Sequence, residues 1–135
     1  MIMHRTSVPL LWRRFKHHYR LLGNHCKTCK TDYYPPREIC PACRRKGVLE
    51  EKEFGKTGTI YSHSIIYSGP TGFERQTPYA VALIKLDNGP ILVSQIVDAP
   101  LDQVKIGMKV EAIFRKVYED GKEGIIHYGL KWKPA

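Results

Sequence analysis

No run of apolar residues in this 135-residue chain approaches the eighteen that would predict a membrane-spanning helix. The first fourteen residues also lack the uninterrupted apolar stretch of a secretory signal peptide, so we expect a cytoplasmic protein with no membrane partner. Catalytic fingerprints are missing too: there is no Gly-x-Ser-x-Gly elbow, phosphate-binding loop or dinucleotide motif, and the acidic residues are scattered rather than paired. These absences argue against an enzyme.

Acidic residues are scarce in the N-terminal third of the chain. Residues 1–52 contain 12 lysines and arginines against 4 aspartates and glutamates, whereas residues 53–135 contain 10 against 9. Most of the net charge of +9 therefore belongs to the N-terminal third. This imbalance favours an anionic partner, such as phosphates, an acidic protein surface or nucleic acid, although a solvated basic face without a ligand is also open.

Cysteine occurs only four times, in two Cys-x-x-Cys pairs that ten residues separate: Cys26, Cys29, Cys40 and Cys43. Two such knuckles, joined by a short hairpin, form the tetrahedral four-sulfur shell that zinc favours. Disulfides are not expected without a secretory signal, and a redox Cys-x-x-Cys would stand alone beside a βαβ pattern. We predict structural zinc, because four thiolates leave no open position for water.

The segments on either side of the cysteines differ in character. Residues 8–18 are predicted to form a helix with an apolar stripe along one side. The stripe consists of Val8, Leu11, Phe15, Tyr19 and Leu22, with Trp12 at its edge. It either packs on the protein itself or docks on a partner. We divide the chain into a helix and lead-in strand (1–24), a zinc ribbon (25–47) and a β domain (48–135).

The β domain is predicted to contain five strands, with a short helical connection within 98–106 between the third and the fourth. The strands are expected at 57–67, 79–86, 90–97, 109–118 and 124–132. This pattern is typical of an OB-fold, the five-stranded Greek-key barrel, whereas an immunoglobulin-like sandwich would need about seven strands. We therefore predict a mainly β protein with an N-terminal helix, a rubredoxin-like zinc ribbon and a C-terminal OB-fold.

A zinc ribbon joined to an OB-fold has two obvious uses. One is nucleic-acid binding, in which bases stack on barrel aromatics along a positive groove, and the candidate rings are Tyr61, Tyr67, Phe73, Tyr79 and Tyr128. The nearly neutral barrel argues against this use, because phosphate contacts dominate such affinity. The other use is scaffolding of enzymes that handle acyl thioesters.

Several motifs together resemble one family. They are Trp12, Tyr19-Arg20-Leu21-Leu22-Gly23, the two Cys-x-x-Cys pairs, Tyr34-Pro35-Pro36-Arg37-x-x-Cys40-Pro41-x-Cys43, Gly58-Thr59-Ile60-Tyr61-Ser62 and Pro78-Tyr79-Ala80-Val81-Ala82-Leu83. The family is domain-of-unknown-function family thirty-five, also called the acyl-CoA-associated OB-fold proteins, and the resemblance covers nearly the whole chain. One departure is Lys30, where the family often has the glycine that eases a left-handed turn.

The resemblance implies a non-catalytic subunit that works with thiolase-fold enzymes. In archaeal members it bridges acetoacetyl-CoA thiolase and hydroxymethylglutaryl-CoA (HMG-CoA) synthase of the mevalonate pathway, which leads to isoprenoids, and helps form a shared channel for coenzyme A. Bacterial relatives pair with thiolase-like aldolases or with hydratases, so an equivalent subunit of such a complex is an alternative. On this basis we expect structural zinc and contact with coenzyme A or acyl-CoA within the complex.

Two groups of residues are then candidates for contacts. The loop 68–78 would border the ligand face of the barrel, and we expect Gly69, Gly72, Phe73 and Tyr79 to contact the cofactor. The helix and the ribbon would hold the partner enzymes through Leu11, Trp12, Phe15 and Arg37.

Overall fold

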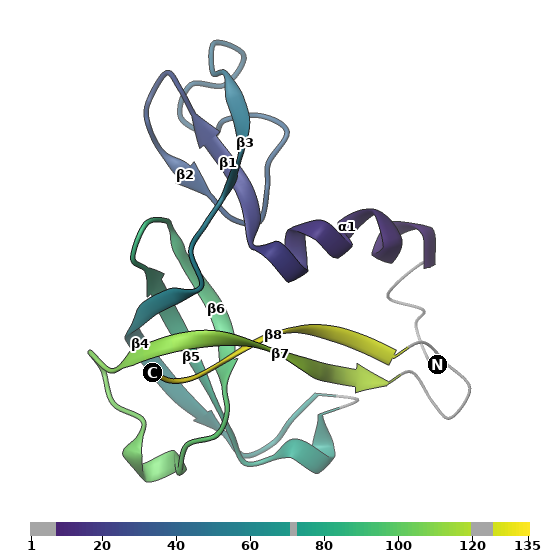
Figure 1. Ribbon diagram of the computed structural model, residues 1–135, viewed down its shortest axis with the longest axis vertical. Coiled ribbons are helices and arrows are strands. Elements are labelled where there is room, and N and C mark those ends of the chain that lie inside the picture. Colours follow the sequence, from purple (N-terminus) through teal and green to yellow (C-terminus); the bar gives the residue numbers. More distant parts are fainter. Residues whose placement is uncertain (1–7, 71–72, 120–125) are drawn as a thin grey trace. The chain divides into compact units, whose positions relative to one another are not determined.

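The computed structural model describes residues 8–70, 73–119 and 126–135, and for Leu11 and Tyr118 it describes the backbone alone. The first element is helix α1 (Val8–Arg20) (Figure 1). The chain divides into unit 1, Met1–Phe54, and unit 2, Gly55–Ala135. No helix in the described part of the chain has both the length and the hydropathy that a membrane span needs.

Unit 1 consists of α1 and a small antiparallel sheet. The sheet has the order β2-β1-β3, with β1 at Leu22–Cys26, β2 at Asp32–Tyr33 and β3 at Leu49–Glu53. The helix runs two residues beyond the predicted His18 and is followed by Leu21, whose φ of 51° lies in the left-handed region. Leu22 therefore begins β1, the lead-in strand expected before the ribbon, and does not extend the helical stripe.

Strand β3 belongs to unit 1, although the sequence placed its residues in the 48–135 segment and predicted no strand there. Its sequence, Leu-Glu-Glu-Lys-Glu, has none of the β-branched or aromatic residues that signal a strand. Pairing with β1 and three surface ion pairs hold it instead: Lys16–Glu51 at 3.2 Å, Arg20–Glu53 at 2.8 Å and Lys27–Glu50 at 3.0 Å.

Unit 2 is a closed barrel with the strand order β4-β5-β6-β8-β7 (Figure 1). The strands are β4 (Thr57–Ile66), β5 (Tyr79–Leu86), β6 (Ile91–Ile96), β7 (Lys109–Glu119) and β8 (Ile126–Pro134). β4 also pairs with β7, which closes the sheet, and the short helix η2 (Leu101–Gln103) connects β6 to β7. This topology confirms the predicted OB-fold.

Inward-facing side chains fill the barrel interior, most regularly along β5. In β5, Ala80, Ala82, Ile84 and Leu86 are buried, while the residues between them face outward or are half-buried. Ile60, Val110 and Trp132 from three other strands complete the centre of the core. Because side chains fill this barrel, a ligand would meet it from outside or at a loop.

Candidate metal centre and docking surfaces

The four cysteines of unit 1 lie together. Their sulfur atoms are all within 4.8 Å of one another, with Cys29 Sγ 3.7 Å from Cys40 Sγ and Cys26 Sγ 4.0 Å from Cys43 Sγ. Tetrahedral zinc with bonds of about 2.3 Å to sulfur requires neighbouring sulfurs about 3.8 Å apart. The donor set therefore fits a structural zinc, whose role here would be to hold unit 1 together.

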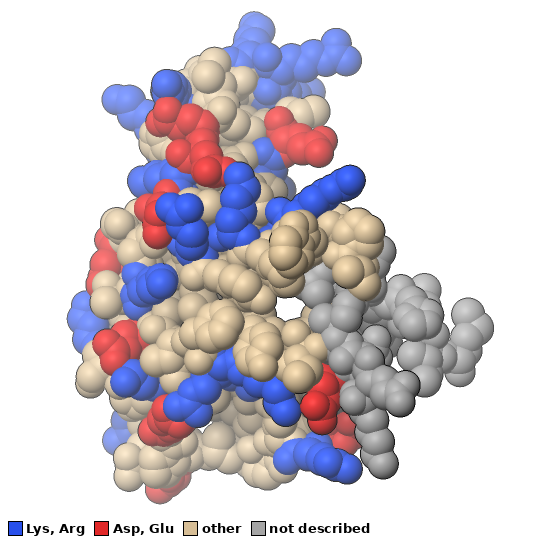
Figure 2. Space-filling model, turned by 45° about the vertical axis from the view of Figure 1, so that its right-hand side comes forward, with Lys and Arg blue, Asp and Glu red and all other residues tan. Residues whose placement is uncertain are grey.

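Both knuckles use the same turn. The amide of Lys30 donates to the Cys26 carbonyl at 2.8 Å, and the amide of Arg44 donates to the Cys40 carbonyl at 2.7 Å. Lys30 and Arg44 both have left-handed backbones, with φ of 57° and 54°. The turn that glycine often provides in the family is thus made here by a basic residue in each knuckle. Figure 2 shows lysines and arginines gathered at this end of unit 1, at the top of the view.

Tyr33 in β2 supports the sulfur cluster from the side. Its hydroxyl lies 3.5 Å from Cys40 Sγ, and this hydrogen bond, together with the Cys43 amide 3.4 Å from the same sulfur, lowers the pKa of the Cys40 thiol to about 6. The same contact raises the pKa of Tyr33 to about 12. Tyr33 thus favours the thiolate form that binds a metal.

Gly47 lies against the second knuckle, so we expect Gly47→Ala to weaken zinc binding. A Cβ at this position would lie 2.7 Å from the Cys40 Cβ and 3.1 Å from the Cys43 Cβ, so the knuckle would have to move. We expect at least a tenfold loss of zinc affinity, equivalent to about 1.4 kcal/mol, measured by competition with a chromophoric chelator. Lys46→Ala, one residue earlier and exposed, is the control; equal affinities in the two variants would contradict the steric argument.

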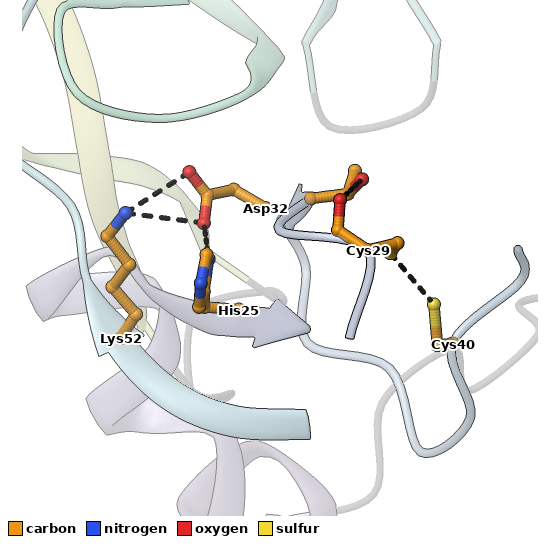
Figure 3. A network of polar contacts seen from close by, with 6 residues as sticks. His25, Cys29, Asp32, Cys40 and Lys52 are labelled. Atoms are coloured by element: carbon orange, nitrogen blue, oxygen red, sulfur yellow. Dashed lines mark hydrogen bonds and ion pairs between the residues drawn. The ribbon is translucent and has the colours of Figure 1, made fainter. Parts of the chain in front are cut away.

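A polar network ties the three strands of unit 1 together beside the cysteines (Figure 3). His25 Nδ1 lies 2.6 Å from Asp32 Oδ1, and Lys52 Nζ lies 3.2 Å from Asp32 Oδ2. The three residues come from β1, β2 and β3, so Asp32 on β2 connects to its neighbour β1 through His25 and to β3, on the far side of β1, through Lys52. Sequence reasoning missed this network, because only the strand register brings His25 opposite Asp32.

The loop between β4 and β5 gathers three of the four residues expected at the cofactor. The rings of Phe73 and Tyr79 are 6.1 Å apart, and a Cβ at Gly69 would come within 3.1 Å of the Phe73 carbonyl oxygen. Gly72 lies outside the described residues. The loop also contains the short helix η1 (Glu74–Gln76), whose Gln76 side chain donates to the Val117 carbonyl at 3.0 Å and so fixes the loop to β7.

The aromatic residues expected at the partner enzymes form a stack along α1. Trp12 and Phe15 have ring centroids 5.4 Å apart, and Phe15 stacks on Tyr19 at 5.1 Å. Trp12 is 71% exposed, while Phe15 is half-buried. The side chain of Leu11 lies outside the described residues, and Arg37 stands on the loop before the second knuckle, 5.5 Å above the Tyr33 ring.

Unit 2 has an exposed apolar patch of its own, which we call the barrel patch, formed by Tyr61, Leu83 and Val93. Leu83 of β5 pairs directly with Val93 of β6, and Tyr61 lies at the β-bulge of β4 next to the partner of Leu83. All three side chains are exposed, Val93 to 66%. The sequence showed the alternation but gave no sign that three outward positions would line up.

Two family models match consecutive parts of the chain. Residues 16–49 match the ChsH2 rubredoxin-like zinc ribbon domain, and residues 51–115 match the ChsH2 C-terminal OB-fold domain. These matches cover the segments in which the structure shows the four-cysteine ribbon and the first four strands of the closed barrel.

Similar proteins share this two-part design over nearly their full length. A DUF35 domain-containing scaffold protein of Methanocaldococcus jannaschii is 48% identical, over 91% of this chain and 87% of its own. A protein of the same name from Methanothermobacter thermautotrophicus is 46% identical, over 96% and 97%. A solved chain described as Ltp2-ChsH2(DUF35) aldolase superposes with a TM-score of 0.69 at 27% identity, over 99% of this chain and 98% of its own. With its ribbon, its barrel and these relatives, the chain belongs to the DUF35 domain-containing scaffold proteins.

Proposed function

We propose that this protein bridges acetoacetyl-CoA thiolase and HMG-CoA synthase, and that it does so without catalysing a reaction itself. The observation that carries the proposal is that each unit exposes an apolar patch of its own: the α1 stack around Trp12 in unit 1 and the barrel patch in unit 2. A scaffold between two enzymes needs two such surfaces, because each partner must cover apolar area to bind stably.

The two patches have the composition of interface centres. Trp and Tyr are enriched among the residues that dominate binding energy, and both patches contain one of them surrounded by apolar neighbours. Most of the chain's net positive charge lies in unit 1, and it would steer association with an acidic enzyme surface.

The proposal includes contact with coenzyme A at the loop between β4 and β5. Phe73 and Tyr79 offer an aromatic wall there, and Gly69 lets the Phe73 backbone approach closely. Such a wall suits the pantetheine arm of coenzyme A, which is long, narrow and largely apolar. The loop would then line a passage through which acetoacetyl-CoA moves from one enzyme to the other.

Reconstitution with the two purified enzymes tests the proposal. We expect size-exclusion chromatography with light scattering to show a ternary complex. Trp12→Glu should abolish binding of one enzyme to the scaffold, and Val93→Glu should abolish binding of the other. Each loss should exceed about 30-fold in affinity, because a charge at the centre of an interface costs about 2 kcal/mol or more. In the assembled complex, Phe73→Glu should slow the coupled conversion of acetyl-CoA to HMG-CoA.

Matched variants separate docking from general surface changes. Val48→Glu in unit 1 and Ile106→Glu in unit 2 place the same charge at exposed apolar positions outside the patches, and both should bind normally. If neither enzyme binds and nucleic acid co-elutes instead, the scaffold proposal fails and nucleic-acid binding takes its place. A coupled rate unchanged by Phe73→Glu would remove the coenzyme A contact and leave the bridging role.

A further inference from the structure

Unit 1 contains a cleft that the scaffold role does not use. It has a volume of about 510 Å³ and lies between α1 and the loop that precedes the second knuckle. Its lining residues are Leu10, Arg13, Arg14, His17, His18, Asn24, Tyr34, Pro35, Pro36, Arg37 and Glu38. This volume is within the range of small-molecule sites, although the cleft is open to solvent on one side.

One face of α1 supplies most of the positive charge. Arg13 and His17 are four residues apart and so share one side of the helix, as do Arg14 and His18. These two adjacent sides both line the cleft. The other basic residues of α1 are neutralised, because Lys16 and Arg20 form ion pairs with β3. Among residues 8–70, 73–119 and 126–135, no carboxylate forms an ion pair with Arg13 or Arg14.

The opposite wall is held in place by two hydrogen bonds across the cleft. The Tyr34 hydroxyl donates to the His17 carbonyl of α1 at 3.5 Å, and the Asn24 side-chain amide of β1 donates to the Arg37 carbonyl. The Arg37 guanidinium lies over the Tyr33 ring, which limits its orientations. This wall thus adds a third arginine on a fixed loop, and Glu38 is the one carboxylate in the lining.

Two histidines bear on what the cleft could hold. His17 Nδ1 is buried and has no hydrogen-bond partner in the described part of the chain, an arrangement that costs free energy unless a ligand or water satisfies it. Partial burial, and then the charges of Arg14 and His17, lower the pKa of His18. The positive groups therefore already repel one another, and a bound anion would relieve that repulsion.

We propose that this cleft binds a phosphorylated small molecule, whose phosphate meets Arg13, Arg14 and Arg37 and whose organic body rests on the proline and tyrosine wall. Guanidinium groups pair bidentately with phosphate oxygens. A terminal phosphate offers three such oxygens and up to two negative charges, so it can meet three arginines at once, whereas a carboxylate offers two oxygens and one charge. Pro35, Pro36 and Tyr34 offer an apolar surface of a size that inorganic phosphate alone would leave uncovered. The site is separate from the zinc ligands and from both docking patches.

Calorimetric titration of the full, zinc-loaded chain tests the proposal at constant ionic strength. The probes are coenzyme A, adenosine 3′,5′-bisphosphate and inorganic pyrophosphate, with acetate as an anion without phosphate. We expect saturable one-to-one binding of at least one phosphate probe, with affinity falling about tenfold or more in Arg13→Ala/Arg14→Ala. Alanine favours the helix at these exposed positions, so the variant should remain folded. Arg37→Met should weaken binding from the other wall.

A charge-matched variant distinguishes a site from general attraction. Arg45→Ala/Lys46→Ala removes the same two charges from exposed positions of unit 1 outside the cleft and should bind as the parent does. If pyrophosphate binds, the cleft recognises the phosphates by themselves. If only the two nucleotides bind, the cleft recognises the organic body as well as the phosphates. Both results support the proposal. Equal losses in the two double variants, no saturable binding of any phosphate probe, or binding only of an acidic peptide or an oligonucleotide would overturn it.

The pH dependence adds a further criterion. The charged and titratable groups that line the cleft together with His18 are Arg13, Arg14 and His17 of α1 and Tyr34, Arg37 and Glu38 of the loop, while Asn24 of β1 is neutral. Protonation of His18 below its lowered pKa adds one positive charge. The probe itself takes up protons in this range, so the parent is compared with His18→Gln at each pH. The ratio of the parent's affinity to that of His18→Gln should rise by up to about tenfold as the pH falls from 7.5 to 5.5. A profile that is identical in the variant would exclude His18 from the site.

This inference does not depend on the bridging role. All titrations use the chain alone, so they remain informative if neither enzyme binds. Conversely, the enzymes could assemble normally on a chain whose cleft binds no phosphate, and the two results would then separate the two proposals.

Discussion

Cys26→Ala/Cys29→Ala is expected to abolish zinc binding and to unfold unit 1. The apolar core of unit 1 is small: among the side chains that the structure describes between residues 8 and 54, those buried and apolar, apart from the cysteines, are Leu21, Leu22 and Phe54. A core of this size does not stabilise a unit of about 50 residues without help. Structural zinc supplies apparent binding free energies of about 10–16 kcal/mol in small zinc domains, so its loss removes the main stabilising contribution.

Hydrogen exchange detected by mass spectrometry, together with metal analysis, measures this effect unit by unit. We expect the amides of β1 and β3 to lose protection, while those of β5 stay protected, because the barrel has its own core. Arg45→Ala/Lys46→Ala, beside the second knuckle, changes two exposed residues that are not ligands and should keep both zinc and protection. Retention of protected β1 amides in metal-free protein would show that the ribbon folds without its metal.

Trp132→Ala is expected to destabilise unit 2 by about 3–5 kcal/mol, the range for truncating a large buried aromatic side chain. Trp132 is 1% exposed and lies opposite Ala112 of β7 and Ile96 of β6. Its removal would open a cavity where three strands meet. Since domains of this size are stable by about 5–15 kcal/mol, the variant should be close to unfolding; urea denaturation followed by circular dichroism measures the change.

The second tryptophan provides a matched comparison. Trp12→Ala removes the same side chain from an exposed position on α1 and should change stability by less than about 0.5 kcal/mol. Its effect should appear instead in binding of a partner enzyme. A loss of less than about 1 kcal/mol in Trp132→Ala would mean that the barrel can collapse around the gap.

The sequence predicted the barrel well because its strands carry two independent signals. In β5, alternation and β-branched or aromatic residues agree, and the observed bounds, Tyr79–Leu86, match the prediction. β3 carried neither signal, since charged residues form it and its stability comes from β1 and from ion pairs with α1 and Lys27. A strand of this kind is visible only once its partners are placed.

The candidate sites divide in the same way. The cysteine spacing predicted that four sulfur atoms would meet, and the structure brings them together. Three other features of unit 1 could not be predicted from the sequence, because these depend on strand register and on close approach of the backbone. They are Tyr33 beside Cys40, Gly47 against the second knuckle, and the His25–Asp32–Lys52 network. The basic cleft was equally hidden: Arg13 and Arg37 are 24 residues apart, and the fold of unit 1 brings them into one lining.

The two sheets also determine how this protein can associate with other chains. The barrel is closed, and the sheet of unit 1 ends in a two-residue strand on one side and, on the other, in β3, which has four charged residues out of five. Neither offers the long apolar edge on which a further strand could be added, the usual route to aggregation. The protein can therefore expose Trp12, Tyr61 and Val93 with little risk of fibril growth. Partner proteins must bind its exposed side chains rather than pair with its strand backbone.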